Sequence, residues 1–331
     1  MKILITNISY HCSVGAVKLL RKSNIDNLHI VGCSEYDFGF CCGSLMVDKY
    51  YKVSSKEQAE QYIQQIIKIC IENQIDFIIS ADEKEQLLFI ENKAFFEKRT
   101  VLLDRQTIET FVDKYEANLA VSQLGINVPK IFQKEDMNSY NKSKVIVREK
   151  VSCCSYGIQI IDSPTCEKIN KCDLSNSFIQ EYIDGDEYTV DVLCDINGIP
   201  KYIIPRKRIA IRNGITYKCL IENNELLISN CKKIYKEYYI PGFSNVQFIV
   251  RNGEAYFIEL NPRLGGTTIA SSLVTKNLME EYVNHFYNGQ AILSDSSINW
   301  NTIITRYYEE KAYTLKEWDE DATIKRNIKN I

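Results

Sequence analysis

The residues best suited to chemistry lie in one largely apolar stretch, FSNVQFIVRNGEAYFIELNPRLGG, which begins at Phe243. Two β-rich runs flank an Asn-Gly pair, which is a strong local signal for a β-hairpin. A register that places Gln247 opposite Glu259 would bring an amide and a carboxylate together, with Asn261 and Arg263 close by. Mg²⁺ prefers oxygen ligands, and arginine suits phosphate. The hairpin therefore predicts a site for a metal and a phosphorylated compound.

Side-chain alternation along the second run of this hairpin assigns its two faces. Successive strand residues point to opposite faces of a sheet. We therefore expect Phe257, Glu259 and Asn261 to share one face, with Ile258 and Leu260 on the other. The first of these faces would bind the metal.

A second charged stretch is PRKRIAIR. Alternation places Arg206, Arg208 and Arg212 on one face and Lys207 on the other. Guanidinium groups this close repel one another unless anions lie between them, so anionic ligands such as phosphates and carboxylates are candidates. Ion pairs with the acidic segment Asp184–Glu187 are the alternative.

Two further positions could bind the same anions. Arg306 lies in the strand-like run IITRYY and could contact a substrate carboxylate. The segment LGGTT follows the hairpin, and its backbone N–H groups and the Thr267 hydroxyl could bind substrate or phosphate.

The overall composition excludes several classes of function. The chain has 331 residues, of which 45% are apolar and 25% charged, and its net charge is -3. These are the values of a folded globular protein without a basic field, so neither nucleic acid nor a membrane is an expected partner. No run approaches ~20 apolar residues, and MKILITNISY lacks the features of a signal peptide. Twelve cysteines without a CxxC pair, and only three histidines, favour free thiols in a reducing cytoplasm over a zinc site.

The first hundred residues alternate strand-like and helix-like segments. We expect strands at Lys2–Thr6, Leu28–Cys33, Ile75–Ser80 and Thr100–Asp104, and helices at Val14–Leu20, Lys56–Asn73 and Glu85–Lys98. This order predicts a doubly wound parallel sheet. The first strand-to-helix turn, NISYHCSVG, lacks the pattern G-x-G-x-x-G, which argues against a nicotinamide-dependent oxidoreductase.

The rest of the chain has a different pattern of elements. We expect helices at Val112–Gly125, Glu225–Tyr239 and Val274–Gly289, and strands at Val145–Glu149 and Ile158–Ile161 around a turn of small residues. Three further runs, Ser177–Ile183, Glu187–Asp195 and Ile199–Arg212, are expected to form an antiparallel meander.

The order of these motifs resembles the ATP-grasp superfamily. It is most similar to the ATP-grasp modules of carbamoyl-phosphate synthetase large chains and to their small stand-alone carboxylate–amine ligase relatives. NVQF…FIELNPR is similar to the family segment NVQF…IEMNPR, and the likeness spans nearly the whole chain. The resemblance implies an α/β and α+β fold with a doubly wound, parallel-sheet pre-ATP-grasp domain at residues 1–104. An ATP-grasp subdomain with a phosphate flap would follow at 105–176, and one with the adenine, metal and substrate sites at 177–331.

The resemblance also implies a role for each residue of the hairpin. Glu259 and Asn261 would bind Mg²⁺, with Gln247 as a further ligand, and Arg263 would contact the transferring phosphate. Arg206 and Arg208 would join it as catalytic groups at the mouth of the cleft. The ordinary alternative for the hairpin residues is an ion pair at a strand end.

The same resemblance implies a nucleotide site. Glu181 would bind the adenine amino group, the backbone at Tyr182 and Ile183 would contact the ring edge, and Glu187 would hold the ribose hydroxyls. The alternative for both acids is an ordinary solvated position.

Five residues are implied to bind the phosphates: Lys114, Arg148, and Ser152, Ser155 and Gly157 of the flap. The alternatives are a surface ion pair for the arginine and a simple helix N-terminus for the lysine.

The flap departs from the family pattern. The usual proline is absent, and Cys153 and Cys154 stand where small or glycine residues are normal. Glycine lets backbone N–H groups close on phosphate, so this segment is the least typical part of the expected ATP site.

We therefore expect an ATP- and Mg²⁺-dependent ligase of the cytoplasm, in which Mn²⁺ could replace Mg²⁺. It would activate a small carboxylate as an acyl phosphate for attack by an amine. Its partners would be these two small molecules, and a homodimer remains open. The alternatives are a carbamoyl-phosphate synthetase-type activity on carbamate, and an ATP-binding sensor without turnover, which the altered flap favours.

Overall fold

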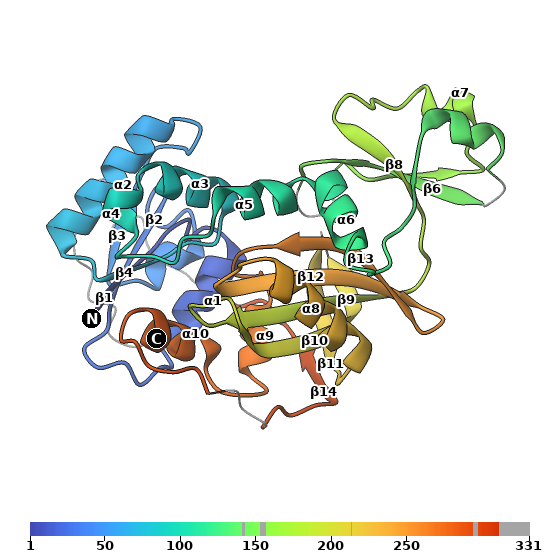
Figure 1. Ribbon diagram of the computed structural model, residues 1–331. Helices are drawn as coiled ribbons and strands as arrows, with labels where there is room; N and C mark the ends of the chain where they lie inside the picture. Colours follow the sequence, from blue (N-terminus) through green and yellow to red (C-terminus); the bar gives the residue numbers. More distant parts are fainter. Residues whose placement is uncertain (141–142, 153–156, 213, 294–296, 311–331) are drawn as a thin grey trace.

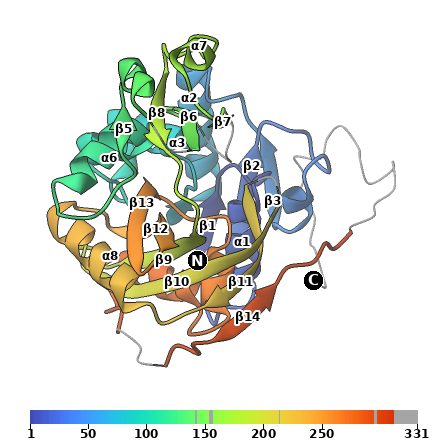
Figure 2. The same cartoon turned by 90° about the vertical axis from the view of Figure 1, so that its right-hand side faces the viewer.

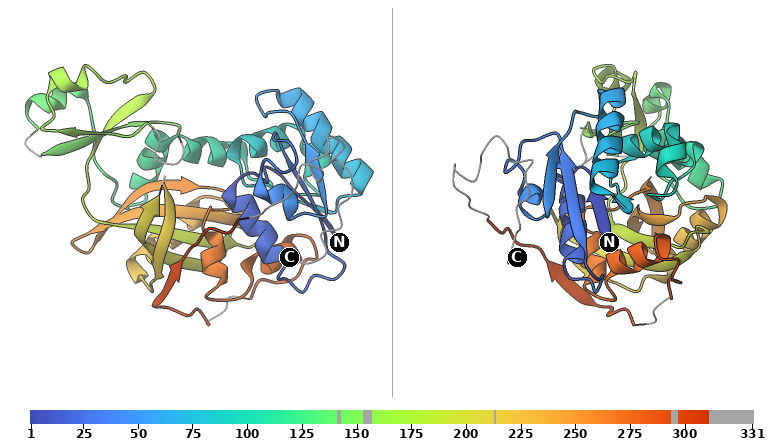
Figure 3. Two further views of the ribbon diagram at one scale, coloured as in Figure 1. Left: turned by 180° about the vertical axis from the view of Figure 1, so that it is seen from behind. Right: turned by 90° about the vertical axis from the view of Figure 1, so that its left-hand side faces the viewer.

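The computed structural model describes residues 1–140, 143–152, 157–212, 214–293 and 297–310. Its strands form three sheets, and Figure 1 shows how they are arranged. A four-stranded sheet and its helices occupy one end, and a smaller four-stranded sheet lies at the other end, above the six-stranded sheet. The view from behind in Figure 3 shows the same separation of the two ends.

The N-terminal sheet is parallel, with strand order β3-β2-β1-β4. Its strands are β1 (Lys2–Ile5), β2 (His29–Ser34), β3 (Lys49–Lys52) and β4 (Phe77–Ile79). The helical segments around it are α1 (His11–Leu20), η1 (Cys42–Leu45), α2 (Ala59–Asn73), α3 (Glu83–Glu91) and α4 (Lys93–Phe96). The doubly wound parallel sheet expected from the sequence is therefore confirmed.

Two local expectations in this part of the chain are wrong. Residues 100–104 form no strand, because Asp104 instead caps the helix α5 (Arg105–Val112) by accepting a hydrogen bond from the Thr107 N–H at 2.7 Å. The helix expected from Val112 begins two residues later as α6 (Lys114–Ser122). Asp113 separates the two helices in an extended conformation, and its carboxylate caps the second.

The small sheet is antiparallel, with strand order β5-β8-β6-β7. Its strands are β5 (Ile131–Phe132), β6 (Lys144–Glu149), β7 (Gln159–Asp162) and β8 (Ser177–Glu181). Two short helical segments lie between them in sequence, η2 (Lys134–Asn138) and α7 (Cys166–Ile169). A small core that includes Phe132, Val147 and Ile179 holds it together.

The large sheet has the order β13-β12-β9-β10-β11-β14 and is antiparallel throughout. Its strands are β9 (Asp186–Cys194), β10 (Pro200–Arg212), β11 (Ile215–Ile221), β12 (Gly242–Arg251), β13 (Glu254–Asn261) and β14 (Thr302–Thr305). The helices of this region are α8 (Glu225–Glu237), α9 (Thr268–Ser272) and α10 (Leu278–Phe286). Figure 2 shows β12 and β13 side by side below the small sheet.

The expected three-strand meander is wrong in one respect. β9 and β10 pair as expected, but β8 pairs with β5 and β6 in the small sheet. The chain therefore leaves one sheet after Glu181 and enters the other at Asp186. The domain boundaries at 104/105 and 176/177 stay predictions, and β8 lies beyond the second of them.

A shared core joins the parallel sheet to the large sheet. Ile3 of β1 and Ala16 of α1 belong to one buried cluster with Tyr202 of β10, Phe243 of β12 and Met279 of α10. Burial of apolar side chains on this scale resists relative movement of the two sheets. The N-terminal part is therefore a fixed wall of any site formed beside it.

None of the helices in the described ranges is both long and apolar enough to cross a bilayer.

Candidate active site

β12 and β13 form the expected hairpin in the expected register, with Gln247 opposite Glu259 and Asn245 opposite Asn261. The turn residues between them have positive φ, as a two-residue Asn-Gly turn requires. Gln247 Nε2 donates to Glu259 Oε1 at 2.7 Å, and Asn261 Nδ2 donates to the same oxygen at 3.1 Å. Two amides and one carboxylate thus form a single polar cluster.

The expected placement of Phe257 on this polar face is wrong. Gln247 pairs with Glu259, but the next residue, Phe248, pairs with Phe257. Ile258 is therefore the extra residue of a β-bulge, which changes the alternation. Phe257 is fully buried in the core, while Glu259 stays on the side of the cluster.

Arg148 of β6 reaches this cluster from the small sheet. Its Nη2 atom lies 3.4 Å from Glu259 Oε2, and only 6% of its side chain is exposed. Burial lowers the pKa of Arg148, and the Glu259 carboxylate partly opposes this. Its Nε–H is buried and has no partner among the described residues. An unmet buried donor is uncommon, so this guanidinium is well placed to bind an anion such as phosphate.

Lys114 lies under the flap. It is the first residue of α6, it is buried, and its Nζ donates to the backbone carbonyl of Ser152. Its backbone N–H donates to the Lys150 carbonyl at 2.8 Å. These contacts connect the start of α6 to the described part of the flap.

The flap is described only in part. Ser155, Cys153 and Cys154 lie outside the described residues, so nothing is concluded about them. Gly157 has a φ of +70°, and an added Cβ would lie 2.6 Å from the Glu149 side chain. Both the backbone angle and the space therefore require glycine at this end of the flap.

The predicted adenine-binding residues lie where β8 leaves the small sheet. Glu181 Oε2 accepts a hydrogen bond from the Lys130 N–H at 3.4 Å. Tyr182 is partly buried, and Ile183 is buried. This short linker between two sheets is a suitable position for backbone contacts with a ring edge.

Glu187 and Arg208 are paired at the start of the large sheet. Arg208 Nη1 lies 3.0 Å from Glu187 Oε2, and Arg208 Nη2 donates to the Gly214 carbonyl at 2.7 Å. Lys207 forms a similar pair with Asp186 at 2.6 Å. Burial lowers the pKa of Arg208, and Glu187 opposes this. The ligand-free structure thus shows the ion pairs that were the alternative for this segment.

The regular alternation expected through Arg212 is wrong. β10 is interrupted by register shifts between Arg208 and Ala210 and between Ala210 and Ile211. A β-bulge redirects the side chains that follow it. Arg212 is exposed and lies over the Tyr217 ring, 4.2 Å from its centroid.

Arg206 is the most deeply buried charge of the group. Its Nε and Nη2 atoms donate to the two oxygens of Asp191 at 2.7 and 3.0 Å, and the Ser271 hydroxyl donates to the same carboxylate at 2.5 Å. Burial opposes its charge, but Asp191 outweighs burial and raises the pKa of Arg206. Its Nη1 has no hydrogen-bond partner in the described ranges, and the Cys219 thiol beside the guanidinium is at most a weak acceptor.

Arg263 follows the hairpin and pairs with the N-terminal part of the chain. Its Nε lies 2.7 Å from Glu83 Oε1 of α3, and its Nη2 donates to Asn261 Oδ1 at 3.4 Å. Burial opposes its charge, but Glu83 outweighs burial and raises the pKa of Arg263. Arg263 is therefore held beside the predicted metal ligands by an acid of α3, a helix of the N-terminal part.

The other two acceptor candidates lie in the loop after the hairpin and after β14. Thr267 is buried in the loop before α9. Arg306 is the residue directly after β14. Burial is the main cause that lowers the pKa of Arg306, and the positive charge of Arg206 lowers it further. No side-chain hydrogen bond or ion pair of Arg306 is found within the described part of the chain.

Comparison with known proteins identifies the family. Residues 111–267 match the family model described as an ATP-grasp domain. The chain contains an ATP-grasp domain. The match covers the flap, the two ends of the linker between sheets and the metal hairpin.

One sequence relative and two solved structures show how far this likeness extends. The carbamoyl phosphate synthase large chain of Lachnoclostridium phytofermentans is 33% identical over 108 residues, which are 29% of this chain and 10% of the synthase. An N5-carboxyaminoimidazole synthetase from Staphylococcus aureus, complexed with ADP, superposes with a TM-score of 0.68 at 16% identity over 92% of this chain and 79% of that one. Biotin carboxylase from Campylobacter jejuni gives 0.70 at 17% identity, over 91% and 74%.

A metal in this ATP-grasp domain would depend on one carboxylate. The described residues contain no group of three or more His, Cys, Asp or Glu side chains that could hold a metal. The amide oxygens of Gln247 and Asn261 could join Glu259 as ligands. A hard cation needs about six oxygens, so phosphate oxygens and water would have to complete the set.

Three residues that contact the predicted site or the loop after it were missed by the sequence analysis: Glu83 pairs with Arg263, Asp191 pairs with Arg206, and His11 lies against Gly266. Glu83 and His11 carry no local signal, because their partners lie far away in the sequence. Asp191 could have been found, since it is the one acid inside the apolar strand run YTVDVLC. A lone acid at such a position usually has a buried partner.

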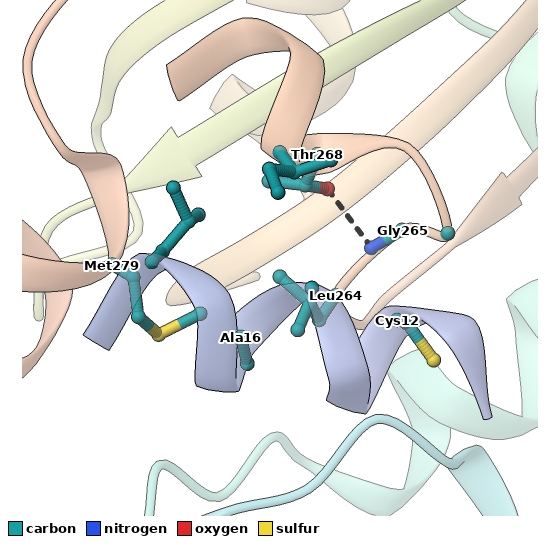
Figure 4. Close-up of a pocket in the computed structure, with 10 residues that line it drawn as sticks. Cys12, Ala16, Leu264, Gly265, Thr268 and Met279 are labelled. Atoms are coloured by element: carbon teal, nitrogen blue, oxygen red, sulfur yellow. Dashed lines mark hydrogen bonds between the residues drawn. The ribbon is translucent and has the colours of Figure 1, made fainter. Parts of the chain in front are cut away.

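Two hollows lie beside the ATP-grasp site. Figure 4 shows the smaller, a cavity of about 10 Å³ between α1 and the loop after β13, lined by Cys12, Ala16, Leu264 and Met279. It has room for no more than about one water, so this loop is packed tightly against α1. The larger cavity, of about 460 Å³, borders the flap and includes Gly157 in its lining.

Proposed function

We propose that the chain is an ATP- and Mg²⁺-dependent ligase that activates a small carboxylate as an acyl phosphate for attack by an amine. The observation that carries this proposal is the convergence on Glu259 of Gln247, Asn261 and Arg148. The first two come from one hairpin, and the arginine comes from the opposing sheet. ATP as the nucleotide is supported by the match to the ATP-grasp domain.

The described residues fit a metal–nucleotide complex. Glu259, Asn261 and Gln247 would hold Mg²⁺, which would neutralise charge on the β- and γ-phosphates. The unmet Nε–H of Arg148 and the ammonium group of Lys114 would bind phosphate oxygens. Glu181, Tyr182 and Ile183 would contact adenine, and Ser152, Ser155 and Gly157 would close over the phosphates. Phosphoryl transfer needs little covalent help, so alignment and charge would supply the catalysis.

The acceptor side would use three arginines. Arg263 lies beside the metal ligands and would contact the transferring phosphate. The unmet Nη1 of Arg206 and the pairing of Arg208 with Gln247 Oε1 at 3.5 Å support roles next to it. The carboxylate and the amine are proposed as small molecules; the cytoplasm and a homodimer stay expectations.

Two other functions have observations in their favour. The similarity to a carbamoyl phosphate synthase large chain favours phosphorylation of carbamate. The cysteines of the flap favour an ATP sensor without turnover. The retention of Glu259, Asn261, Gln247 and Arg263 favours the ligase, because binding alone does not need a complete metal site.

The deciding experiment is ADP release from MgATP in the presence of pooled amino acids and small carboxylates, bicarbonate included. Substrate-dependent ADP release that disappears in Glu259→Gln supports the ligase. Release with bicarbonate and ammonia alone supports the carbamate activity. ATP binding by calorimetry with no turnover in any pool would support the sensor and contradict the ligase.

We predict that Glu187→Ala weakens ATP binding about tenfold. A carboxylate that accepts ribose hydroxyls contributes about 1.5 to 3 kcal/mol, and release of Arg208 offsets part of the loss. Isothermal calorimetry with MgADP measures the effect. Asp186→Ala is the matched control, because it removes an adjacent acid that pairs with Lys207. Equal affinities in wild type and Glu187→Ala would contradict the ribose assignment.

A further inference from the structure

His11 stands at the edge of the parallel sheet that faces the ATP-grasp site. It is the first residue of α1, directly after β1 and its connecting turn. Parallel α/β sheets bind ligands at the carboxyl ends of their strands. His11 therefore lies at the position in the N-terminal domain where a substrate group would be met.

The imidazole of His11 is in close contact with the loop that follows the metal hairpin. A Cβ added to Gly266 would lie 2.0 Å from His11 Nε2. Gly266 is three residues beyond Arg263, and the Gly265 N–H to Thr268 Oγ1 bond of 3.1 Å, drawn in Figure 4, fixes the loop. The ring is thus held beside the proposed acceptor site.

The charges around His11 are positive. Burial lowers the pKa of His11 to about 4, and the guanidinium groups of Arg306 and Arg263 contribute to this. The neighbouring Cys12 thiol is neutral, since burial raises its pKa. The Glu83 carboxylate is paired with Arg263. The imidazole is therefore neutral at pH 7 and keeps a free lone pair.

No hydrogen bond of the His11 ring is found in the described part of the structure, although the residue is largely buried. A histidine with a purely structural role normally has such a bond. His285 fits that description, since the Ile196 N–H donates to its Nε2 at 2.8 Å and its Nδ1 lies 2.6 Å from the Gln290 carbonyl oxygen. The side chain of His29 is about half exposed and lies 3.7 Å from Asp48.

We propose that His11 is a catalytic residue that accepts the proton lost by the amine when it attacks the acyl phosphate. This inference rests on the proposed ligase function. The neutral amine forms a bond from nitrogen to the acyl carbon, and the bond from that carbon to the phosphate oxygen breaks. Phosphate leaves with the electron pair of the broken bond. One proton passes from the nitrogen to a ring nitrogen of His11, which later releases it to water.

Arg306 and Arg263 also explain how substrate binding would make the His11 imidazole more basic. In the free protein, Arg306 and Arg263 disfavour the imidazolium. A substrate carboxylate bound to either guanidinium cancels part of that charge and makes His11 more basic. The base would thus strengthen only when an acceptor is present.

The charge environment gives a prediction that needs no substrate. By NMR, the His11 ring signal, assigned by its absence from His11→Gln, should titrate near pH 4, and Arg306→Gln should raise its pKa. The folded pKa lies below the ordinary value of 6.5, so the unfolded chain binds this proton first. The low pKa of His11 therefore decreases the free energy of unfolding as the pH falls from 6.5 to about 4. The free energy of unfolding of His11→Gln should fall less than that of wild type over this pH range.

The test of the proposal compares two nucleophiles. Wild type and variants receive MgATP and a pool of the twenty common amino acids and small carboxylates, with or without hydroxylamine. Amide products and hydroxamates are measured by mass spectrometry. Hydroxylamine is an unprotonated, strong nucleophile at neutral pH, so it needs little help from a base. We expect His11→Gln to form amides about 10²-fold more slowly, with hydroxamate formation within about twofold of wild type.

Gly266→Ala is a second variant, in which the added methyl group must displace the ring of His11. It should also form amides more slowly while hydroxamate formation stays close to that of wild type. His29→Gln is the matched control and should leave both products unchanged.

Three results would overturn the proposal. An equal loss of amides and hydroxamates would mean that His11 serves carboxylate activation instead. Unchanged amide formation in His11→Gln would show that no base is needed there. Absence of both products in wild type is a failure of the ligase function itself, visible without any variant, and it would take this inference with it.

Discussion

Glu259→Gln is expected to reduce substrate-dependent ADP release by about 10³-fold or more. Glu259 is the single carboxylate of the predicted metal site, and two amides and Arg148 converge on it. The amide of glutamine removes the negative charge that would attract Mg²⁺. Initial rates of ADP release at saturating MgATP measure the effect.

The control for this experiment lies on the same hairpin. Glu254 is exposed at the turn, where it accepts a hydrogen bond from the Tyr256 hydroxyl at 2.7 Å. Glu254→Gln should retain full activity. If Glu259→Gln releases ADP as fast as Glu254→Gln does, the metal assignment is wrong. Calorimetry with ADP in the absence of metal should show both variants correctly folded and able to bind nucleotide.

Asp191→Leu is expected to lower the free energy of unfolding by about 3 to 5 kcal/mol. It leaves the fully buried guanidinium of Arg206 without its carboxylate partner, and the hydroxyl of Ser271 loses its acceptor. Urea unfolding followed by circular dichroism measures the loss. Asp186→Leu, which breaks the largely exposed pair with Lys207, should change stability by less than about 1 kcal/mol.

A double variant separates the structural role of this pair from the proposed catalytic one. Asp191→Leu combined with Arg206→Met replaces both charges by apolar groups, which commonly restores most of the stability lost. We expect the double variant to be folded and to remain inactive in ADP release, because Arg206 is proposed to bind the acceptor. Recovered activity together with recovered stability would show that Arg206 only supports the fold.

Short-range features of the chain predicted much of the molecule correctly. The alternation of strands and helices over the first hundred residues predicted a parallel sheet. The strands β1 to β4 form that sheet, so the prediction is confirmed. The Asn-Gly turn predicts the hairpin and the pairing nearest the turn, from Arg251 opposite Glu254 to Phe248 opposite Phe257, whereas the Gln247–Glu259 pair depends on the bulge at Ile258. Such features depend on neighbours within a few residues.

Bulges and sheet membership could not be predicted in this way. The bulge at Ile258 turns Phe257 into the core, and those after Arg208 end the alternation of β10. β8 joins the small sheet although its sequence continues into β9. An extra residue or a change of sheet is decided by what the strand can bury on each side, and that is a property of the packed molecule.

The sequence by itself determined the resemblance to the ATP-grasp domain and the hairpin that carries the predicted metal ligands, because local turn chemistry and strand periodicity are encoded by adjacent residues. Only the tertiary structure decided what faces that hairpin. Arg148 meets Glu259 across 111 positions of chain, Glu83 of helix α3 pairs with Arg263, and His11 meets the loop at Gly266. Contacts between residues so distant in sequence form only when the sheets pack together, since the burial of a common core brings them into reach.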